Sequence, residues 1–311
     1  MSKLKTAVIG VGYLGKFHAE KYHRLENSEL IAVVDADLVT AQNIADKFGV
    51  KALTDYHELL GTVDAVSIAA PTTLHHRIAC DFLTHGSHVL IEKPITVTVD
   101  EADELLKLAT KNHCIIQVGH LERFNAAMLD INTQLNSPRF IESHRLAPFN
   151  SRAIDVDVVL DLMIHDIDII LDLVDSDITN IQVSGTKVLT DSTDIANARI
   201  QFNNGCVANI TASRVSAKNE RMMRIFQNDA YISVDFQNLE LKISRKGDNE
   251  MQSGIPEIIS EHSHFESNDA LLLEIEAFLD SIQNGAPVLV TGEAGRRALD
   301  TAINISNLLS D

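Results

Sequence analysis

The stretch that decides the fold is KTAVIGVGYLG at residues 5–15, an apolar run that ends in three closely spaced glycines. The run predicts a buried β-strand, and the helical pattern of residues 17–25 follows directly after the last glycine. In a dinucleotide-binding unit, Gly10 permits the tight turn and Gly12 lets a pyrophosphate approach the backbone, while Gly15 lets the helix pack closely on the strand. The stretch therefore predicts a strand, turn and helix that bind a dinucleotide.

The second apolar run, residues 30–34, ends in Asp35, twenty residues after Gly15. A carboxylate in this place accepts hydrogen bonds from the ribose hydroxyls of NAD and repels the 2′-phosphate of NADP. We therefore expect NAD as the cofactor, with NADP disfavoured by Asp35. The alternative interpretation is a βαβ unit that holds no dinucleotide.

Strands and helices continue to alternate up to residue 118, with apolar runs at 65–70, 88–91 and 115–118. This alternation predicts a Rossmann-type, doubly wound parallel sheet, in which ligands bind at the carboxyl ends of the strands. Motifs at those ends join the glycine turn as candidates for cofactor binding. The predicted cofactor-binding residues are Gly10, Gly12, Tyr13, Leu14, Gly15, Asp35, Pro71, Thr72, His75, Glu92 and Lys93.

The second half of the chain has a different pattern, with short strand-like runs between residues 181 and 243 and a hairpin signal at Asn203-Asn204-Gly205. Helical patterns return at 269–283 and 293–309. We expect an α/β protein with a dinucleotide-binding domain over 1–121. We expect a second α/β domain over 122–311 that contains these strands, with its C-terminal helices free to pack back on the first domain.

Composition restricts the partners of the protein. Its 311 residues suggest two domains, and its formal net charge of −18 argues against nucleic acid or an anionic membrane as a partner. The three cysteines lack the spacing of metal ligands, which is typical of reduced core thiols. No signal segment and no run of about 18 apolar residues is evident, so we expect a cytoplasmic enzyme.

A second candidate site lies in residues 159–174, which have an almost entirely apolar helical pattern. At about 100° per residue, Asp161, His165, Asp168 and Asp172 fall on one narrow stripe. An all-round apolar helix is usually buried, and charged groups on it must be paired or face a cavity. An ordinary surface helix with a polar stripe is the alternative.

Taken together, the glycine turn, residues 71–75, HVLIEKP at 88–94, Arg123-Phe124-Asn125 and the pair Asp161 and His165 resemble the Gfo/Idh/MocA oxidoreductase family. The resemblance implies a nicotinamide-dependent dehydrogenase of CH–OH groups. It also implies that the second α/β domain has an open, mainly antiparallel sheet, and that a homodimer or homotetramer forms through this sheet. One departure is that many members have a glycine pair shortly before the aspartate, where this chain has Asp155-Val156-Asp157.

Residue by residue, Lys93, Asp161 and His165 match the catalytic lysine, aspartate and histidine of that family. His165 would take the proton of the substrate hydroxyl, and Asp161 would orient the imidazole. Lys93 would stabilise the developing charge on the same oxygen. We interpret Asp168 and Asp172 as pocket wall or ion-pair partners.

The segment 145–172 is similar to nucleotide-sugar dehydrogenases, which implies a substrate such as UDP-N-acetylglucosamine, oxidised at its 3-hydroxyl to a ketone. Arg123 and Arg152 are the predicted substrate-binding cations, together with Asp161 and His165 at the reacting carbon. A diphosphate needs a local basic patch in so acidic a protein. The candidates for it are Arg123, Arg145, Arg152, Arg214, Arg221 and Arg224.

Three alternatives remain open at this point. A free sugar or inositol is the second candidate substrate, and a dinucleotide-sensing regulator without turnover is a candidate of another class. A metal centre built from His75, His76, His120, His165 and Asp161 is the third, but no spacing demands one and we expect no metal. We expect His262 and His264 to lie in a surface loop.

Overall fold

The structure is a computed structural model that describes residues 2–131, 134–150, 156–252 and 254–310. The chain divides into two compact units. Unit 1 contains residues 1–121 and 269–299, and unit 2 contains residues 122–268 and 300–311. One division thus falls at residue 121, and residues 269–299, which include α7 (Ala270–Asn284), belong to unit 1.

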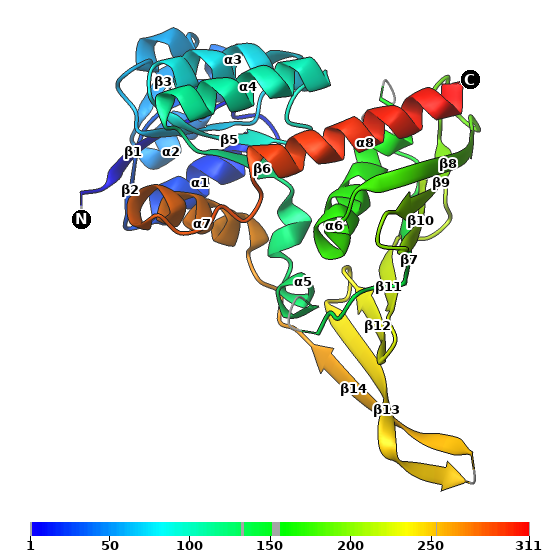
Figure 1. The fold of residues 1–311 in the computed structure, drawn as a ribbon. Helices are drawn as coiled ribbons and strands as arrows, with labels where there is room; N and C mark the ends of the chain where they lie inside the picture. Colours follow the sequence, from blue (N-terminus) through cyan, green and yellow to red (C-terminus); the bar gives the residue numbers. More distant parts are fainter. Residues whose placement is uncertain (1, 132–133, 151–155, 253, 311) are drawn as a thin grey trace. The chain divides into compact units, whose positions relative to one another are not determined.

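Unit 1 is built on a six-stranded, fully parallel sheet in the order β3-β2-β1-β4-β5-β6 (Figure 1). Its strands are β1 (Leu4–Ile9), β2 (Ser28–Val34), β3 (Lys51–Leu53), β4 (Ala65–Ile68), β5 (His88–Glu92) and β6 (Ile116–Gly119). Its helices are α1 (Gly15–Arg24), α2 (Leu38–Phe48), α3 (Thr72–Thr84), α4 (Val99–Asn112) and α7 (Ala270–Asn284), with a 3₁₀ turn η1 at Tyr56–Leu59.

The central strands of this sheet are apolar because both faces are covered. Every residue of β4 is buried, and α1 packs with α7 while α3 packs with α4 on the opposite face, as Figure 1 shows. The order of the strands is that of a Rossmann sheet, so the first part of the predicted fold is confirmed.

Unit 2 is built on an eight-stranded sheet in the order β14-β13-β12-β11-β7-β10-β9-β8. Its strands are β7 (Phe140–Leu146), β8 (Ile178–Thr186), β9 (Ile195–Phe202), β10 (Val207–Ser213), β11 (Glu220–Phe226), β12 (Ala230–Asp235), β13 (Glu240–Gln252) and β14 (Ile255–His264). Its helical segments are η2 (Leu121–Phe124), α5 (Ala126–Ile131), η3 (Val159–Met163) and α6 (Ile164–Val174); α8 (Gly292–Ser310) runs through the division between the units.

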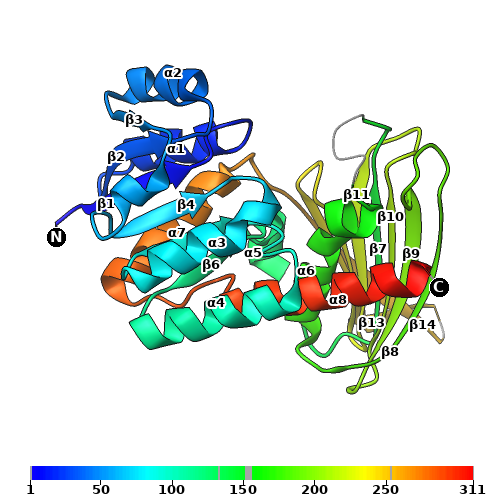
Figure 2. The same cartoon turned by 90° about the horizontal axis from the view of Figure 1, so that it is seen from above.

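The pairing of these strands explains the open sheet. All neighbours are antiparallel except β7 and β10, which run parallel, and β9 and β10 form the predicted hairpin at residues 203–205. Burial alternates along β7, β9, β10 and β12, and α6 packs on β7 and β10. Figure 2 shows α6 on one face of the sheet. The mainly antiparallel second sheet is therefore confirmed.

Two local expectations are wrong. His262 and His264 lie in β14, where both are exposed, and not in a loop. The predicted helix over 159–174 begins with a π-helical segment, η3, before α6. Among the described residues, no helix has both the length and the apolarity needed to cross a membrane.

Candidate active site

The glycine turn of unit 1 has one open position between two crowded ones. Gly10 has φ +85°, and a Cβ there would lie 2.8 Å from the Ala69 carbonyl. At Gly15 a Cβ would lie 1.8 Å from the carbonyl oxygen of Gly10, so helix α1 meets the strand only because no side chain is present. At Gly12 a Cβ would meet nothing within 4 Å. The backbone at Gly12 is therefore accessible to a ligand, as a pyrophosphate requires.

The N-terminus of α1 follows this turn without a side-chain cap. Its N-cap residue Leu14 makes no capping hydrogen bond, and no acidic residue lies in the first turn. The first N–H groups of a helix lack intrahelical acceptors, so this end suits an anion. Tyr13 beside it is 65% exposed and packs edge-on against Phe17, with the Lys16 ammonium 4.9 Å from the centre of the Phe17 ring.

Asp35 holds the same turn in place. One carboxylate oxygen accepts a hydrogen bond from the Val11 N–H at 2.9 Å, and the other accepts from the Asp37 N–H at 3.1 Å. The side chain is half-buried at the end of β2. Each carboxylate oxygen has a further lone pair, so these two bonds leave acceptor capacity for a ribose hydroxyl.

His75 braces the loops at the ends of β4 and β5 rather than facing a ligand. Pro71 is the N-cap residue of α3 and Thr72 is its first residue, which places the buried His75 ring in the first turn. Its Nδ1 lies 3.0 Å from the Pro94 carbonyl oxygen and its Nε2 lies 2.8 Å from that of Ala70. Burial lowers the pKa of His75. These contacts support a positioning role, and none of them supports the predicted direct contact with the cofactor.

Glu92 likewise belongs to an internal polar chain. Its carboxylate lies 2.9 Å from Nε2 of the buried His18, whose Nδ1 lies 3.1 Å from the hydroxyl of Ser67, which is 2.9 Å from the hydroxyl of Tyr22. Burial alone would raise the pKa of Glu92, but the hydrogen bond from His18 and the charge of Lys93 hold it below its usual value. Glu92 is therefore an anion that fixes the end of β5, directly before the candidate catalytic lysine.

In unit 2, the segment that carries Asp161 and His165 is ordered from its N-terminal end by Asp157. The Asp157 carboxylate accepts hydrogen bonds from the backbone N–H groups of Val159 and Leu160, both at 2.9 Å. Asp161 lies in the π-helical segment η3 and His165 in the first turn of α6. The single stripe expected from 100° periodicity is therefore interrupted between these two residues, because a π-turn holds more residues than an α-turn.

Asp161 lines a pocket of about 470 Å³ within unit 2. This volume is in the range of small-molecule sites. The pocket is lined by Ala147, Pro148, Phe149, Asn150, Asp161, Leu162, Arg214 and Asn219. A carboxylate, a guanidinium, two amides and apolar groups thus form a lining of mixed polarity, as in small-molecule sites.

Arg214 forms one wall of this pocket, but its guanidinium already donates hydrogen bonds to other groups of the protein. Its Nε donates to Asp194 at 2.8 Å, and its Nη1 donates to the Val156 carbonyl oxygen at 2.6 Å. Asp194 also accepts from the backbone N–H groups of residues 188–190. Although burial opposes the charge, these donors hold the pKa of Asp194 well below its usual value. Sequence reasoning offered Arg214 as a phosphate ligand, whereas its contacts shape the pocket.

Two buried arginines, Arg123 and Arg145, hold α6 through three ion pairs. Arg123 donates to Asp168 at 2.7 and 3.1 Å and contacts Asp172 at 2.5 Å, so the prediction that these carboxylates are ion-pair partners is confirmed. Arg145, on β7, donates to Asp166 at 2.6 Å. Arg123 and Arg145 are almost completely buried. No contact supports the predicted role of Arg123 in substrate binding.

The remaining arginines of the proposed basic patch are also paired. Arg221 contacts Glu122 at 3.3 Å and Arg224 contacts Glu142 at 3.0 Å. Arg152 lies outside the described residues. Within the part of the chain that the structure describes, Arg221 has the most exposed side chain of this set, at 54%. Sequence reasoning missed Asp157, His18 and Asp166; only Asp166, a charge on an apolar helix, gave a signal that it must be paired.

Comparisons with known proteins agree with this geometry. Residues 4–120 match the model of the "Oxidoreductase family, NAD-binding Rossmann fold", and residues 127–233 match the "GFO/IDH/MocA C-terminal domain". The chain is 41% identical over 306 residues to the UDP-N-acetylglucosamine 3-dehydrogenase of Acidithiobacillus ferrooxidans, covering 98% of this chain and 97% of that protein.

Solved structures give the same result. A structure of the Acidithiobacillus ferrooxidans enzyme matches 99% of this chain and 98% of its own with a TM-score of 0.92. The scyllo-inositol dehydrogenase of Lactobacillus casei, solved with NAD(H) and scyllo-inositol, matches 99% of this chain and 97% of its own with a TM-score of 0.81; at 21% identity it shows the shared fold. The chain is a member of the Gfo/Idh/MocA family of NAD-binding oxidoreductases.

Proposed function

We propose that the protein is an NAD-dependent dehydrogenase that oxidises a secondary hydroxyl of a nucleotide sugar, with the 3-hydroxyl of UDP-N-acetylglucosamine as the first candidate. The observation that carries this proposal is the 41% identity, over nearly the full length, to a UDP-N-acetylglucosamine 3-dehydrogenase. Lys93, Asp161 and His165, which match the catalytic set of the family, are all present.

The chemistry is divided among these three side chains. His165 accepts the proton of the reacting hydroxyl, for which an imidazole is suited near neutral pH. Asp161, which lines the pocket of unit 2, orients the imidazole and favours its protonated form. Lys93 donates a hydrogen bond to the same oxygen and stabilises the negative charge that develops on it. Bound NAD supplies the hydride acceptor.

NAD rather than NADP is the proposed cofactor. Gly12 provides the open backbone for the pyrophosphate, and the uncapped N-terminus of α1 provides its N–H donors. The carboxylate of Asp35 is fixed at the end of β2 by two backbone donors, so it cannot turn away from a 2′-phosphate without losing them. We expect kcat/KM with NAD to exceed that with NADP at least tenfold, measured with one sugar substrate. A higher value with NADP would contradict this role of Asp35.

The diphosphate of the substrate needs donors that are not already used. Arg152 was predicted from sequence, and Arg221 has a mostly exposed guanidinium whose carboxylate neighbour among the described residues is Glu122. We propose these two arginines, rather than the buried Arg123, as the phosphate ligands. Arg221→Gln should then raise KM for the UDP-sugar with little change in kcat, because a remote phosphate contact is made equally in ground and transition states.

The substrate class can be tested by following NAD reduction at about 340 nm with UDP-N-acetylglucosamine, UDP-N-acetylgalactosamine, free N-acetylglucosamine and myo- and scyllo-inositol. We expect turnover with a UDP-sugar alone. Turnover with free polyols alone would favour the second candidate, a free sugar or inositol dehydrogenase. That alternative is supported by 23% identity over 318 residues to the myo-inositol 2-dehydrogenase of Thermotoga maritima. Tight NAD binding without reduction would favour a regulator.

The assembly and location belong to the same proposal. One face of the unit 2 sheet is only half-buried, and the β13–β14 hairpin exposes Met251, Ile255 and Ile258. We propose that this sheet forms a homodimer or homotetramer, which light scattering at micromolar concentration tests; a monomer mass would refute it. A cytoplasmic location fits the three free cysteines among the described residues.

A further inference from the structure

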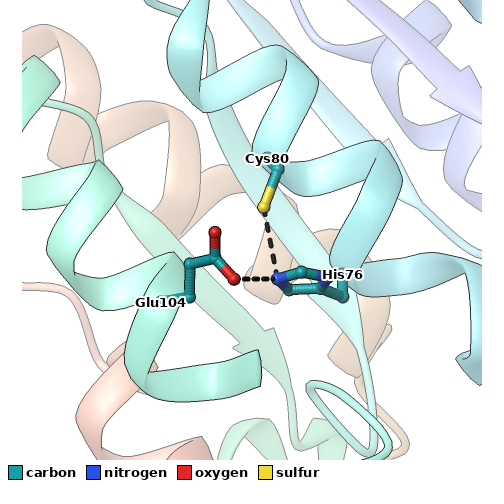
Figure 3. A group of neighbouring side chains, drawn as sticks. All are labelled: His76, Cys80 and Glu104. Atoms are coloured by element: carbon teal, nitrogen blue, oxygen red, sulfur yellow. Dashed lines mark hydrogen bonds and ion pairs between the residues drawn. The ribbon is translucent and has the colours of Figure 1, made fainter. Parts of the chain in front are cut away.

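Three potential metal ligands converge between α3 and α4 of unit 1, in a place that the proposed hydride transfer does not use. His76 and Cys80 are four residues apart on α3 and therefore lie on one face of that helix, and Glu104 reaches them from α4 (Figure 3). The Nε2 atom of His76 lies 3.4 Å from the Cys80 Sγ and 3.0 Å from a Glu104 carboxylate oxygen. All three donor atoms lie within 4.8 Å of one another.

Hydrogen bonding alone satisfies this arrangement poorly. Both the thiol and the carboxylate approach the same nitrogen of His76, as Figure 3 shows. A neutral imidazole nitrogen either carries one proton or offers one lone pair, so it cannot donate to Glu104 and accept from the thiol at the same time. A cation placed between the three atoms would interact favourably with each of them.

The donor set and its spacing suit zinc. Thiolate, imidazole and carboxylate are its three common protein ligands, and a Zn–S bond of ~2.3 Å with a Zn–N bond of ~2.0 Å places tetrahedral ligands roughly 3.3–3.6 Å apart. The separations of 3.0 and 3.4 Å are already close to these values. The carboxylates of Asp81 and Glu101 add negative charge near Cys80. A dication therefore enters a negative environment.

We propose that His76, Cys80 and Glu104 bind one Zn²⁺ ion, with a water molecule as the fourth ligand. The side chains of His76 and Glu104 are 24% and 60% exposed, which gives the ion a path of entry, and Cys80 is half-buried. The ion connects α3 to α4. It thereby holds α3, which begins at Pro71 and Thr72, two of the predicted cofactor-binding residues. It takes no part in proton or hydride transfer.

The direct test is a titration of the full-length, tag-free, metal-stripped protein with Co²⁺ under reducing conditions. We expect one equivalent of Co²⁺ to produce a thiolate-to-cobalt charge-transfer band and the ligand-field bands of a tetrahedral site, and Zn²⁺ to remove both. The absence of a charge-transfer band at one equivalent would overturn the proposal. This readout needs no substrate and no NAD, so it is independent of the proposed dehydrogenase activity.

Variants assign the ligands. Cys80→Ser should abolish the charge-transfer band. His76→Ala and Glu104→Gln should each weaken Zn²⁺ binding by about 10–100-fold or more, because the loss of a residue that only supports a metal ligand already has an effect of that size. The matched controls are Cys114→Ser, the other half-buried thiol of unit 1, and His85→Gln, at the C-cap of α3. Both controls should bind normally.

Thermal unfolding provides a second readout. Zn²⁺ should raise the Tm of the wild type and of both controls but not that of Cys80→Ser, because an ion bound to the folded state alone stabilises it. An equal rise in Cys80→Ser would overturn the site. If Cys114→Ser rather than Cys80→Ser lost the charge-transfer band, the ion would lie elsewhere and the assignment would be wrong.

Discussion

The two units hold their candidate site residues by different physical means. In unit 1 the cofactor turn is shaped by the absence of side chains, since Gly15 lies against the Gly10 carbonyl and Gly12 faces open space. In unit 2 the helix that carries His165 is held by ion pairs, and in two of them, Arg145 with Asp166 and Arg123 with Asp168, both side chains are buried. Unit 1 should therefore be most sensitive to added volume, and unit 2 to the removal of a charge.

The largest effect is expected at His165 itself. His165→Ala should lower kcat by about 10²–10⁴, the usual loss on removing a general base, with the free energy of unfolding little changed because the side chain is only partly buried. Steady-state NAD reduction and urea unfolding measure the two quantities. His262→Ala, on the exposed strand β14, is the control and should keep full activity. Turnover within about threefold of the wild type would contradict the assignment of His165 as the base.

The second prediction concerns the ion pairs of unit 2. Asp166→Ala should lower the free energy of unfolding by about 3–5 kcal/mol, because it leaves the guanidinium of Arg145 buried with fewer acceptors. Asp172→Ala should cost less than about 1 kcal/mol, since its side chain is 39% exposed and Arg123 keeps Asp168. Urea unfolding measures both, and equal losses would contradict the idea that buried charges fix α6.

The third prediction concerns the glycines of unit 1. Gly15→Ala should destabilise the protein by about 1–3 kcal/mol, because its Cβ has no space beside the Gly10 carbonyl. Gly12→Ala should leave the melting temperature unchanged and weaken NAD binding by about tenfold, because the added methyl group stands where the backbone is open to the pyrophosphate. Calorimetric titration with NAD and thermal melts separate the two effects. NAD binding to Gly12→Ala with wild-type affinity would place the cofactor elsewhere.

This difference between the two units also explains how much of each fold could be predicted from sequence. The fold of unit 1 was predictable because a Rossmann sheet depends on local signals, namely buried apolar strands and glycines at a turn. In unit 2, strand β7 was not recognised, because its inward-facing side chains are Ile141, Ser143 and Arg145 rather than an apolar series. An arginine faces inward there only because Asp166 meets it from another element, which no periodicity reveals.

The candidate site was predictable to the same limited extent. The positions of Asp161 and His165 on one helical segment followed from the apolar pattern, but the π-helical geometry at Asp161 did not, because periodicity analysis assumes one constant angle per residue. Arg123 and Arg214 form ion pairs with carboxylates that are distant in sequence, and such pairs depend on tertiary contacts. Their predicted part in phosphate binding therefore rested on residue type alone.

One buried carboxylate of unit 1 differs from the arginine-paired carboxylates of unit 2. Glu274 on α7 is completely buried, and neither of its carboxylate oxygens has a hydrogen-bond partner among the described residues. Burial, and to a smaller extent the charge of Glu92, raises the pKa of Glu274 well above its usual value. Unit 2 pairs its buried carboxylates with arginines, whereas burial without such a partner disfavours the ionised form of this one.

The last prediction follows from this raised pKa. Above the usual pKa of a glutamate, the unfolded chain loses the proton that folded Glu274 keeps, so folding takes up a proton and stability falls as pH rises towards the folded-state pKa. Glu274→Gln removes this dependence, and its stability relative to wild type should rise by about 1.4 kcal/mol for each pH unit in that window. Urea unfolding at pH 5, 6 and 7 measures the slope. Glu276→Gln, an exposed neighbour on the same helix, should follow the wild type at every pH. Parallel slopes for Glu274→Gln and wild type would mean that the buried carboxyl is ionised after all, and the contrast between the units would then disappear.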